Sequence, residues 1–407
     1  MGRYEESLAS LNKSLEIEQN NVEALSERGE TYFKMNRFEE SLADLYQLFA
    51  IESNNALRYR NCIEWISFDR LVDRQIIGKG GFGTVFSAIW LDSQSYKVAL
   101  KTLNNFKEFE NHVRCRLNGL GLEIYGITQD IETQKCLMVF QYANNGNLCN
   151  FLKSNFIKLD WKSKLMYLID VANDLDKIHK SGYVHCDFHS GNILQHQYGS
   201  SFISSFITDL GLSKKLKESA SKGDVYGVMP YIAPEILLGE QYTKASDIYS
   251  MGVIMAELST GKRPFYDYTF DFRLASNICN GLRPGISERT PRCFIELAKQ
   301  CMDSNPCNRP TAKDISSKLS KWRTIITNPS MPISHEESDI KRDFISANDE
   351  ISQITLPNYQ SSKYTSKLIK TKEFKQVYES AKSANFRGNP RNFMRIYIIV
   401  HYCLFNI

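Results

Sequence analysis

Apolar positions change their spacing several times along the 407-residue chain, beginning with a helical repeat. The sequence pattern of the segment from Tyr4 to Leu11 recurs in the segment from Phe38 to Leu45. Every position is shifted by the same number of residues, and an amphipathic stretch lies between the two segments. A period of this length predicts stacked helix-turn-helix units. Only about one and a half units are present, whereas about three usually bury a continuous core. We therefore expect residues 1–58 to form a partial all-α segment that packs on a neighbouring domain or remains from a longer array.

The spacing becomes mixed after a short connector at residues 59–70. Trp65, Ile66 and Phe68 make this connector apolar enough to dock on the next domain. Residues 84–90 and 96–101 are rich in β-branched and aromatic side chains, which predicts two strands. Helical spacing predicts three helices. These comprise residues 106–117, an amphipathic core helix over 165–178, and a helix over 247–258 that is apolar on most sides.

Beyond Arg323 the chain is rich in Ser, Thr, Asn and Lys and has few aliphatic residues until its last ten positions. Such a segment has little apolar surface to bury. We therefore expect residues 324–407 to be a mostly disordered tail.

Composition narrows the class of protein only moderately. The chain has 50 basic and 46 acidic residues, a net charge of +4, and no long basic run, so neither nucleic acid nor a membrane is expected as a partner. Its ten cysteines include no Cys-x-x-Cys pair, which argues against a zinc site. Unpaired thiols and the absence of a secretory signal favour a cytoplasmic location.

The first chemical motif is a glycine loop, Gly78-Lys79-Gly80-Gly81-Phe82-Gly83. This spacing is a weak signal by itself, because dinucleotide-binding folds also use it. In those folds a helix comes after the glycines, whereas here the strand over 84–90 does. The glycines therefore lie at the tip of a hairpin, where the absence of Cβ atoms lets backbone N–H groups approach phosphates closely.

A lysine comes next, in Val98-Ala99-Leu100-Lys101. Alternation along a strand puts Ala99 and Lys101 on one face, so a flat base and phosphate oxygens could be accommodated together. The lysine needs an acidic partner, and the helix over 106–117 offers Glu108 and Glu110. We prefer Glu108, although its distance along the chain from Lys101 is unusually short.

The most specific motif is His185-Cys186-Asp187-Phe188-His189-Ser190-Gly191-Asn192, followed by Asp209-Leu210-Gly211. Ala233-Pro234-Glu235, Asp247 and Arg309 come later in the chain. The order and spacing of these signals resemble the eukaryotic protein kinases, most closely the tyrosine-kinase-like group. The N-terminal repeat resembles tetratricopeptide repeats.

The resemblance implies an α+β, two-lobe protein kinase fold over residues 71–323, with a small lobe at 71–143, a large lobe at 144–323 and ATP between them. It implies transfer of the ATP γ-phosphate to protein hydroxyls, with serine and threonine favoured. Asp187 would orient the acceptor hydroxyl, and Asn192 and Asp209 would hold Mg²⁺. Glu235 and Arg309 would form a buried ion pair. The implied nucleotide-binding residues are Gly78, Gly80, Gly81, Phe82, Gly83, Val85, Ala99, Lys101, Glu108, Gln141, Ala143 and Leu194.

Several positions depart from the family pattern and leave two alternatives open. Cys186 replaces a common arginine, Leu210 a phenylalanine, and Val228 a threonine that contacts the catalytic aspartate. His189 also resembles small-molecule phosphotransferases, which is one alternative. The other is a catalytically weak pseudokinase scaffold whose repeats bind a protein partner, suggested by the short link from Lys101 to Glu108. Ser219, Ser221 and Tyr226 are candidate phosphorylation sites.

Overall fold

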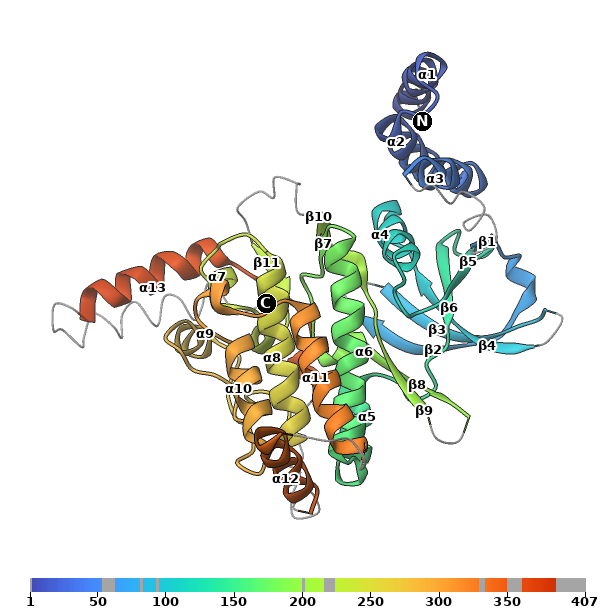
Figure 1. The fold of residues 1–407 in the computed structure, drawn as a ribbon. Helices are drawn as coiled ribbons and strands as arrows, with labels where there is room; N and C mark the ends of the chain where they lie inside the picture. The colour runs from blue at the N-terminus through green and yellow to red at the C-terminus, as the bar shows by residue number, and fades with distance from the viewer. Residues whose placement is uncertain are drawn as a thin grey trace. The chain divides into compact units, whose positions relative to one another are not determined.

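The computed structural model describes residues 2–52, 63–80, 83–92, 95–199, 202–215, 224–328, 334–349 and 361–385. The chain divides into two units, Met1–Ala143 and Asn144–Ile407, and each is described separately (Figure 1). No helix within the described ranges is both long enough and apolar enough to cross a membrane.

A six-stranded sheet forms the centre of the first unit, in the order β1-β5-β6-β4-β3-β2. The strands expected after the glycine loop are confirmed as β3 and β4. One face of the sheet buries an apolar cluster that includes Val98, Leu100 and Val139. The bounds are β1 Glu64–Trp65, β2 Leu71–Gly80, β3 Gly83–Trp90, β4 Tyr96–Thr102, β5 Ile124–Gln129 and β6 Cys136–Gln141.

The connector is part of the sheet as well as a link. Its strand β1 pairs in parallel with β5, with Glu64 opposite Gly126 and Trp65 opposite Ile127. Ile66 joins the buried cluster beneath the sheet. The expected docking of the connector is therefore confirmed. A two-residue strand is too short to show any period in the sequence.

The repeat segment forms three helices that pack on the same unit. Helix α4 (Phe106–Leu117) contacts α2, and the Phe33 and Phe106 rings lie 5.9 Å apart. The rings of Phe38 and Trp65 stack at 6.1 Å. Of the two possibilities left open for the repeats, packing on the neighbouring domain is thus observed. The three helices are α1 Gly2–Ile17, α2 Val22–Lys34 and α3 Phe38–Glu52.

The second unit is mainly helical, with α6 and α8 at its centre (Figure 1). Helix α8 is buried on nearly every side, as its apolar sequence predicts. The helices are α5 Leu148–Asn155, α6 Trp161–Lys180, α7 Pro234–Leu237, α8 Lys244–Thr260, α9 Phe272–Cys279, α10 Arg292–Cys301, α11 Ala312–Thr327, α12 His335–Asp349 and α13 Thr371–Asn385. The short strands are β7 Tyr183–Val184, β8 Ile193–Tyr198, β9 Phe202–Ile207, β10 Lys214–Lys215, β11 Val225–Gly227 and β12 Lys367–Ile369.

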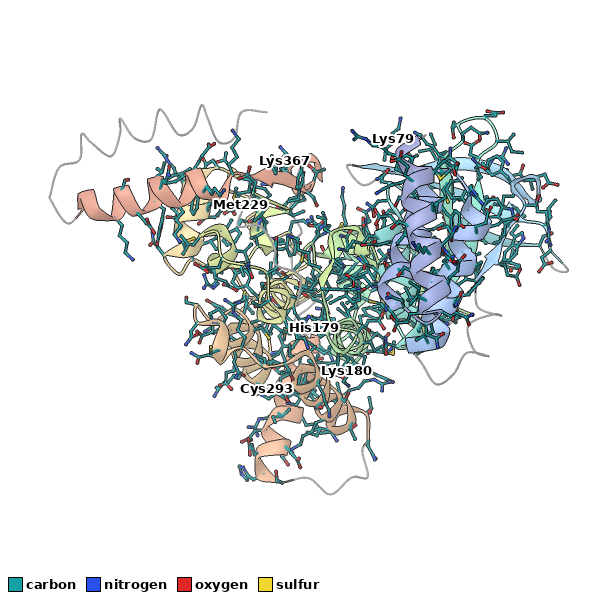
Figure 2. The ribbon with its side chains drawn as sticks, turned by 90° about the horizontal axis from the view of Figure 1, so that it is seen from above. Lys79, His179, Lys180, Met229, Cys293 and Lys367 are labelled. Carbon is teal, nitrogen blue, oxygen red and sulfur yellow. The ribbon has the colours of Figure 1, made fainter. Side chains whose placement is uncertain are left out.

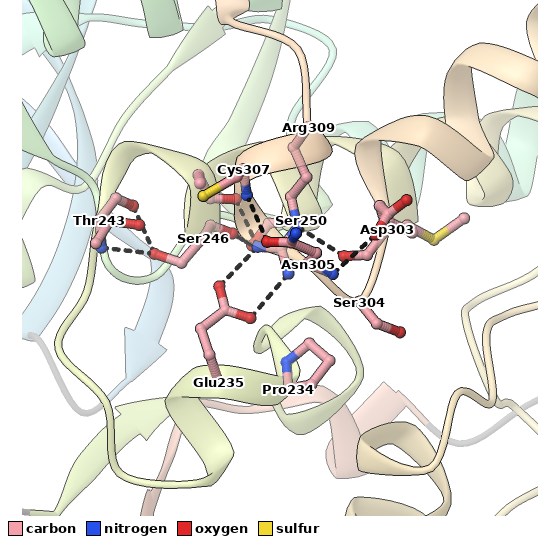
Figure 3. Close-up of polar contacts among 12 residues, drawn as sticks. Pro234, Glu235, Thr243, Ser246, Ser250, Asp303, Ser304, Asn305, Cys307 and Arg309 are labelled. Carbon is pink, nitrogen blue, oxygen red and sulfur yellow. Dashed lines mark hydrogen bonds and ion pairs between the residues drawn. The ribbon is translucent and has the colours of Figure 1, made fainter.

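The expected ion pair between Glu235 and Arg309 is present in this unit (Figure 3). The guanidinium donates from Nη1 to Oε1 at 2.6 Å and from Nη2 to Oε2 at 2.8 Å. It also donates to the backbone carbonyl oxygens of Asp303 and Ala245. These bonds tie α7 to the start of α8 and to the turn before α11.

The expectation of a mostly disordered tail needs correction for residues 334–349 and 361–385. These residues form α12, β12 and α13, which pack on the second unit. Phe344 packs against Trp161, and Phe374 against Phe272, with ring centroids 5.6 and 5.2 Å apart. A few large aromatic side chains thus supply the buried surface that the scarcity of aliphatic residues argued against.

A buried lysine in α6 leads to a pH-dependent stability prediction. Lys164 is fully buried, with its ammonium 4.1 Å from the centre of the Phe156 ring, and burial lowers its pKa to about 7. Between about pH 7 and 10 the unfolded chain therefore binds a proton that the folded chain does not, so stability rises with pH. Lys164→Met is expected to be more stable than the wild type at pH 7, and the gap should shrink by up to about 1.4 kcal/mol per pH unit.

Urea unfolding of both proteins at pH 7, 8 and 9 measures this gap. A gap that stays constant with pH would show that Lys164 titrates normally in the folded chain.

Candidate active site

The lysine motif lies on one face of the sheet in the first unit. Val85 of β3 is opposite Lys101 of β4, and Ala99 lies two residues before Lys101, so all three side chains share a face. Ala99 is partly buried and Lys101 is buried. This arrangement places a small side chain beside a cation, as the sequence predicts.

The ammonium group of Lys101 is paired with Glu108. Nζ donates to Oε1 at 2.6 Å, and both side chains are almost fully buried. Glu110, the other candidate, instead accepts from Arg114 at 2.7 Å, one helical turn away. Of the two acidic residues, Glu108 is therefore the one that holds the lysine.

The short link between lysine and glutamate results from where α4 begins. Asn105 caps the helix, and its side chain accepts from the Glu108 backbone N–H at 2.8 Å. The glutamate therefore lies in the first turn, only seven positions after Lys101. A carboxylate is favourable there because backbone N–H groups give the helix start a partial positive charge.

The glycine loop begins at the end of β2 and continues into β3. Gly83 has φ +121°, and a Cβ there would lie 2.3 Å from Oγ1 of Thr102, so only glycine fits. At Gly80 a Cβ would meet no atom of the described chain within 4 Å. Gly78 pairs with Val85 across the hairpin. Gly81 and Phe82 lie outside the described residues.

Gln141 and Ala143, which the family resemblance assigns to nucleotide binding, lie at the end of β6 and just after it. Phe140 is buried, and its ring lies 5.2 Å from that of His112. Gln141 ends the strand, and Ala143 is partly buried. Leu194, which the family resemblance also assigns to nucleotide binding, lies on β8 of the second unit and bridges to Asn147.

In the second unit, Asp247 of α8 holds the loop over residues 185–192, which the family resemblance predicts to be the catalytic loop. Its carboxylate accepts from the backbone N–H groups of His185 and Cys186, at 2.8 and 3.2 Å, and contacts Nε2 of His179 at 2.9 Å. Cys186 has φ +68°, an uncommon backbone conformation for a residue with a side chain. Asp247 therefore fixes the backbone of this loop through two hydrogen bonds.

Asp187 is 5% exposed and is surrounded by polar groups. Burial raises the pKa of its carboxyl, but His189, the Ser366 hydroxyl and His185 outweigh burial and hold the pKa below its ordinary value. Asn192 donates from Nδ2 to the Asp187 backbone oxygen at 2.9 Å. His189 lies 3.6 Å from Oδ2 and accepts from the Gly191 N–H through Nδ1. Asp187 is thus an ionised group in a shielded position.

Asn192 and Asp209 lie at the same end of the β8–β9 hairpin. Ile193 pairs with Ile207, and the Thr208 N–H donates to the Asn192 backbone oxygen at 3.0 Å. Because Nδ2 of Asn192 donates to Asp187, the side-chain oxygen is left for another partner. An amide oxygen and a carboxylate are hard ligands that suit Mg²⁺. The residues present therefore fit a magnesium ion.

Three of the sequence departures have structural consequences. Burial raises the pKa of the Cys186 thiol well above its usual range, which fits a packed thiol and not a redox sensor. Leu210 is fully buried, so the position keeps an apolar side chain in the core. Val228 is also buried and brings no hydroxyl to Asp187.

Of the proposed phosphorylation sites, Tyr226 is exposed on β11, whereas Ser219 and Ser221 lie outside the described residues.

Two features near the catalytic loop escaped sequence reasoning. Arg263 is buried, and its guanidinium donates to Ser190 Oγ at 2.9 Å and pairs with Glu257 at 3.5 Å. Ser366 of the tail donates to Oδ2 of Asp187 at 2.8 Å. A sequence signal existed for Arg263, because it comes just after Gly261, the glycine that ends α8. Ser366 gave no local signal.

Comparison with known proteins agrees with these arrangements. A model of protein tyrosine and serine/threonine kinases matches residues 71–319, and a model of the TPR repeat matches residues 1–36. Probable serine/threonine-protein kinase roco5 of Dictyostelium discoideum is 29% identical over 267 residues, which are 60% of this chain and 9% of that protein.

Two further relatives are similar over a comparable share of the chain. Putative serine/threonine-protein kinase/receptor R831 of Acanthamoeba polyphaga mimivirus is 30% identical over 64% of this chain and 16% of its own length. Dual specificity protein kinase splA of Dictyostelium discoideum is 29% identical over 61% of this chain and 11% of its own length. The chain therefore spans only a small part of the length of these relatives.

Proposed function

Since the chain belongs to the family of protein tyrosine and serine/threonine kinases, we propose that it transfers the γ-phosphate of ATP to protein hydroxyl groups in intracellular signalling. Serine and threonine are the proposed acceptors, because the names of roco5 and R831 describe serine/threonine kinases. The observation that carries the proposal is Asp187, ionised and buried, on a loop whose backbone Asp247 holds.

Each unit supplies part of the proposed chemistry. In the first unit, Lys101, held by Glu108, neutralises phosphate oxygens. In the second, Asp187 orients the acceptor hydroxyl and takes its proton. Asn192 and Asp209 are the proposed ligands of Mg²⁺, which supplies positive charge to the phosphate oxygens when bound. The proposed nucleotide contacts are Gly78, Gly80, Gly81, Phe82, Gly83, Val85, Ala99, Gln141, Ala143 and Leu194.

The repeat helices are proposed as a protein-interaction segment that also supports α4. Their TPR match favours binding of a protein partner. The Phe33 ring lies 5.9 Å from that of Phe106, at the start of α4, and a Cβ at Gly29 would come within 3.1 Å of the Phe106 ring. This close packing favours a supporting role for the helix that carries Glu108. The cytoplasm is the proposed location, because every cysteine in the described ranges has a free thiol.

A phosphotransfer assay with γ-labelled ATP and Mg²⁺ tests the proposed activity. The chain is offered an array of serine, threonine and tyrosine peptides together with small-molecule alcohols. We expect label on serine and threonine peptides, and its loss when EDTA removes the metal. Absence of label with both Mg²⁺ and Mn²⁺ would favour a pseudokinase scaffold. Label confined to the small alcohols would favour a small-molecule phosphotransferase.

A further inference from the structure

The C-terminal tail lies along the segment that precedes Ala233-Pro234-Glu235. Strand β12 pairs antiparallel with β11, with Lys367 opposite Gly227 and Ile369 opposite Val225. Figure 1 shows α13, the helix after β12, alongside α7, and Figure 2 places Lys367 near Met229. Adding a strand to an exposed strand edge is a common way for a protein to hold an extended peptide. The tail is therefore bound as a peptide would be.

Ser366 directly precedes β12 and reaches the catalytic aspartate. Its Oγ donates to Oδ2 of Asp187 at 2.8 Å, a contact between residues 179 positions apart in the chain. The other carboxylate oxygen, Oδ1, is buried and has no hydrogen-bond partner among the described residues. A primary hydroxyl thus occupies the position where a general base would orient an acceptor.

The chain is anchored just before Ser366. The Lys363 ammonium donates to the carbonyl oxygens of Tyr266 and, at 3.1 Å, Tyr268. The buried Tyr364 donates its hydroxyl to the Pro264 carbonyl at 3.1 Å, and the Arg263 guanidinium lies 4.0 Å from the centre of its ring. These contacts connect the tail to the arginine that also binds Ser190 in the catalytic loop.

The chain is anchored again after Ser366. Ile369 and Thr371 are buried, and Phe374 packs against Phe272 of α9. Farther along α13, the Tyr378 hydroxyl donates to Oδ1 of Asn280 at 2.7 Å. Because the chain is fixed on both sides, Ser366 is held at Asp187 by more than its own hydrogen bond.

We propose that Ser366 is a phosphorylation site of this chain's own kinase domain, and that residues 363–369 occupy the protein-substrate site until the phosphate is transferred. The inference rests on the proposed kinase activity. Ser366 Oγ forms a bond to the γ-phosphorus of ATP, the bond from that phosphorus to the β,γ-bridging oxygen breaks, and ADP leaves with the electron pair. The hydroxyl proton passes to Asp187 and then to water.

Transfer also destabilises the bound tail. Phosphoserine carries a charge of about −1.5 to −2 at pH 7. Such a group beside the ionised Asp187 carboxylate, in a site that excludes water, places like charges close together. The phosphorylated tail therefore leaves Asp187, and the substrate site becomes accessible to other proteins. The tail acts as an inhibitor that is removed by the reaction it blocks.

The test uses the full chain, Mg-ATP and an exogenous peptide substrate found with the array. We expect mass spectrometry to place phosphate on Ser366, and peptide phosphorylation to accelerate as that modification accumulates. The rate of Ser366 modification per molecule should not change on dilution, because the reaction is intramolecular. Ser366→Ala should remain at the slow initial rate. Thr365→Ala, a change at the adjacent exposed residue, should behave like the wild type.

Tyr364→Ala provides a second, independent variant. Loss of its anchoring contacts should raise the initial peptide rate about tenfold, equivalent to about 1.4 kcal/mol of tail binding, and should abolish the acceleration. Cooperative thermal unfolding confirms that this variant folds.

Three outcomes would overturn the inference. Peptide phosphorylation without phosphate on Ser366 would overturn it and leave the proposed kinase activity standing. A rate of Ser366 modification that rises with enzyme concentration would show transfer between molecules and overturn the intramolecular step. No activity in any variant, Tyr364→Ala included, would overturn both the inference and the proposed function.

Discussion

Asp187→Asn is expected to lower kcat for phosphate transfer about 100- to 10,000-fold, the usual contribution of a positioned general base. Asparagine keeps the size of the side chain but cannot take the proton of the acceptor hydroxyl. The backbone of the loop should stay in place, because Asp247 holds it through the N–H groups of His185 and Cys186. The loss should therefore appear in kcat, with little change in the KM for ATP.

Single-turnover transfer to a peptide from the array measures the effect without a contribution from product release. Asp176→Asn is the matched control, because Asp176 is a partly exposed carboxylate of α6 that pairs with Lys180. That variant should keep wild-type activity. If Asp187→Asn retained more than about a tenth of the wild-type rate, the proton-accepting role assigned to Asp187 would have to be withdrawn.

Local sequence signals were sufficient to predict most elements of the kinase domain. The glycine hairpin, the lysine strand and α4 each depend on neighbouring residues, so alternation, helical spacing and turn chemistry located them. Glu108 was preferred as the counterpart of a glutamate of the kinase family, and Asn105 explains its position: an asparagine cap starts α4 shortly after β4. Motif spacing likewise located Asp247 and the Glu235–Arg309 pair.

The features that were missed depend on contacts between distant parts of the chain. Strand β1 is too short for a period to identify it, and its partner β5 is about 60 positions away. The tail has a composition typical of disorder, yet Tyr364 bonds to Pro264 and Phe374 packs against Phe272, each some 100 positions earlier in the chain. The average composition of a segment cannot predict order that depends on a few aromatic side chains packing against distant residues.

The second large effect concerns stability. Glu235→Gln is expected to lower the free energy of unfolding by about 3–5 kcal/mol, because it leaves a buried cation without its counter-charge. The Arg309 side chain is completely buried and that of Glu235 is 15% exposed, so water offers little compensation. The amide retains the shape of the carboxylate, and the cost therefore reports charge more than packing. Urea unfolding measures this change in the free energy of unfolding, and an unchanged m-value shows that the unfolded state is not altered.

An exposed pair in the same unit is the matched control. Arg342 and Asp339 are 2.5 Å apart, but their side chains are 72% and 45% exposed. Asp339→Asn should therefore cost less than about 1 kcal/mol, since solvent screens such pairs. Replacing both partners, as Glu235→Gln with Arg309→Met, should cost less than the sum of the single changes, because no buried charge is then left alone. Equal costs for Glu235→Gln and Asp339→Asn would show that water reaches the Arg309 site, and the pair would lose its proposed role in joining α7 to α8.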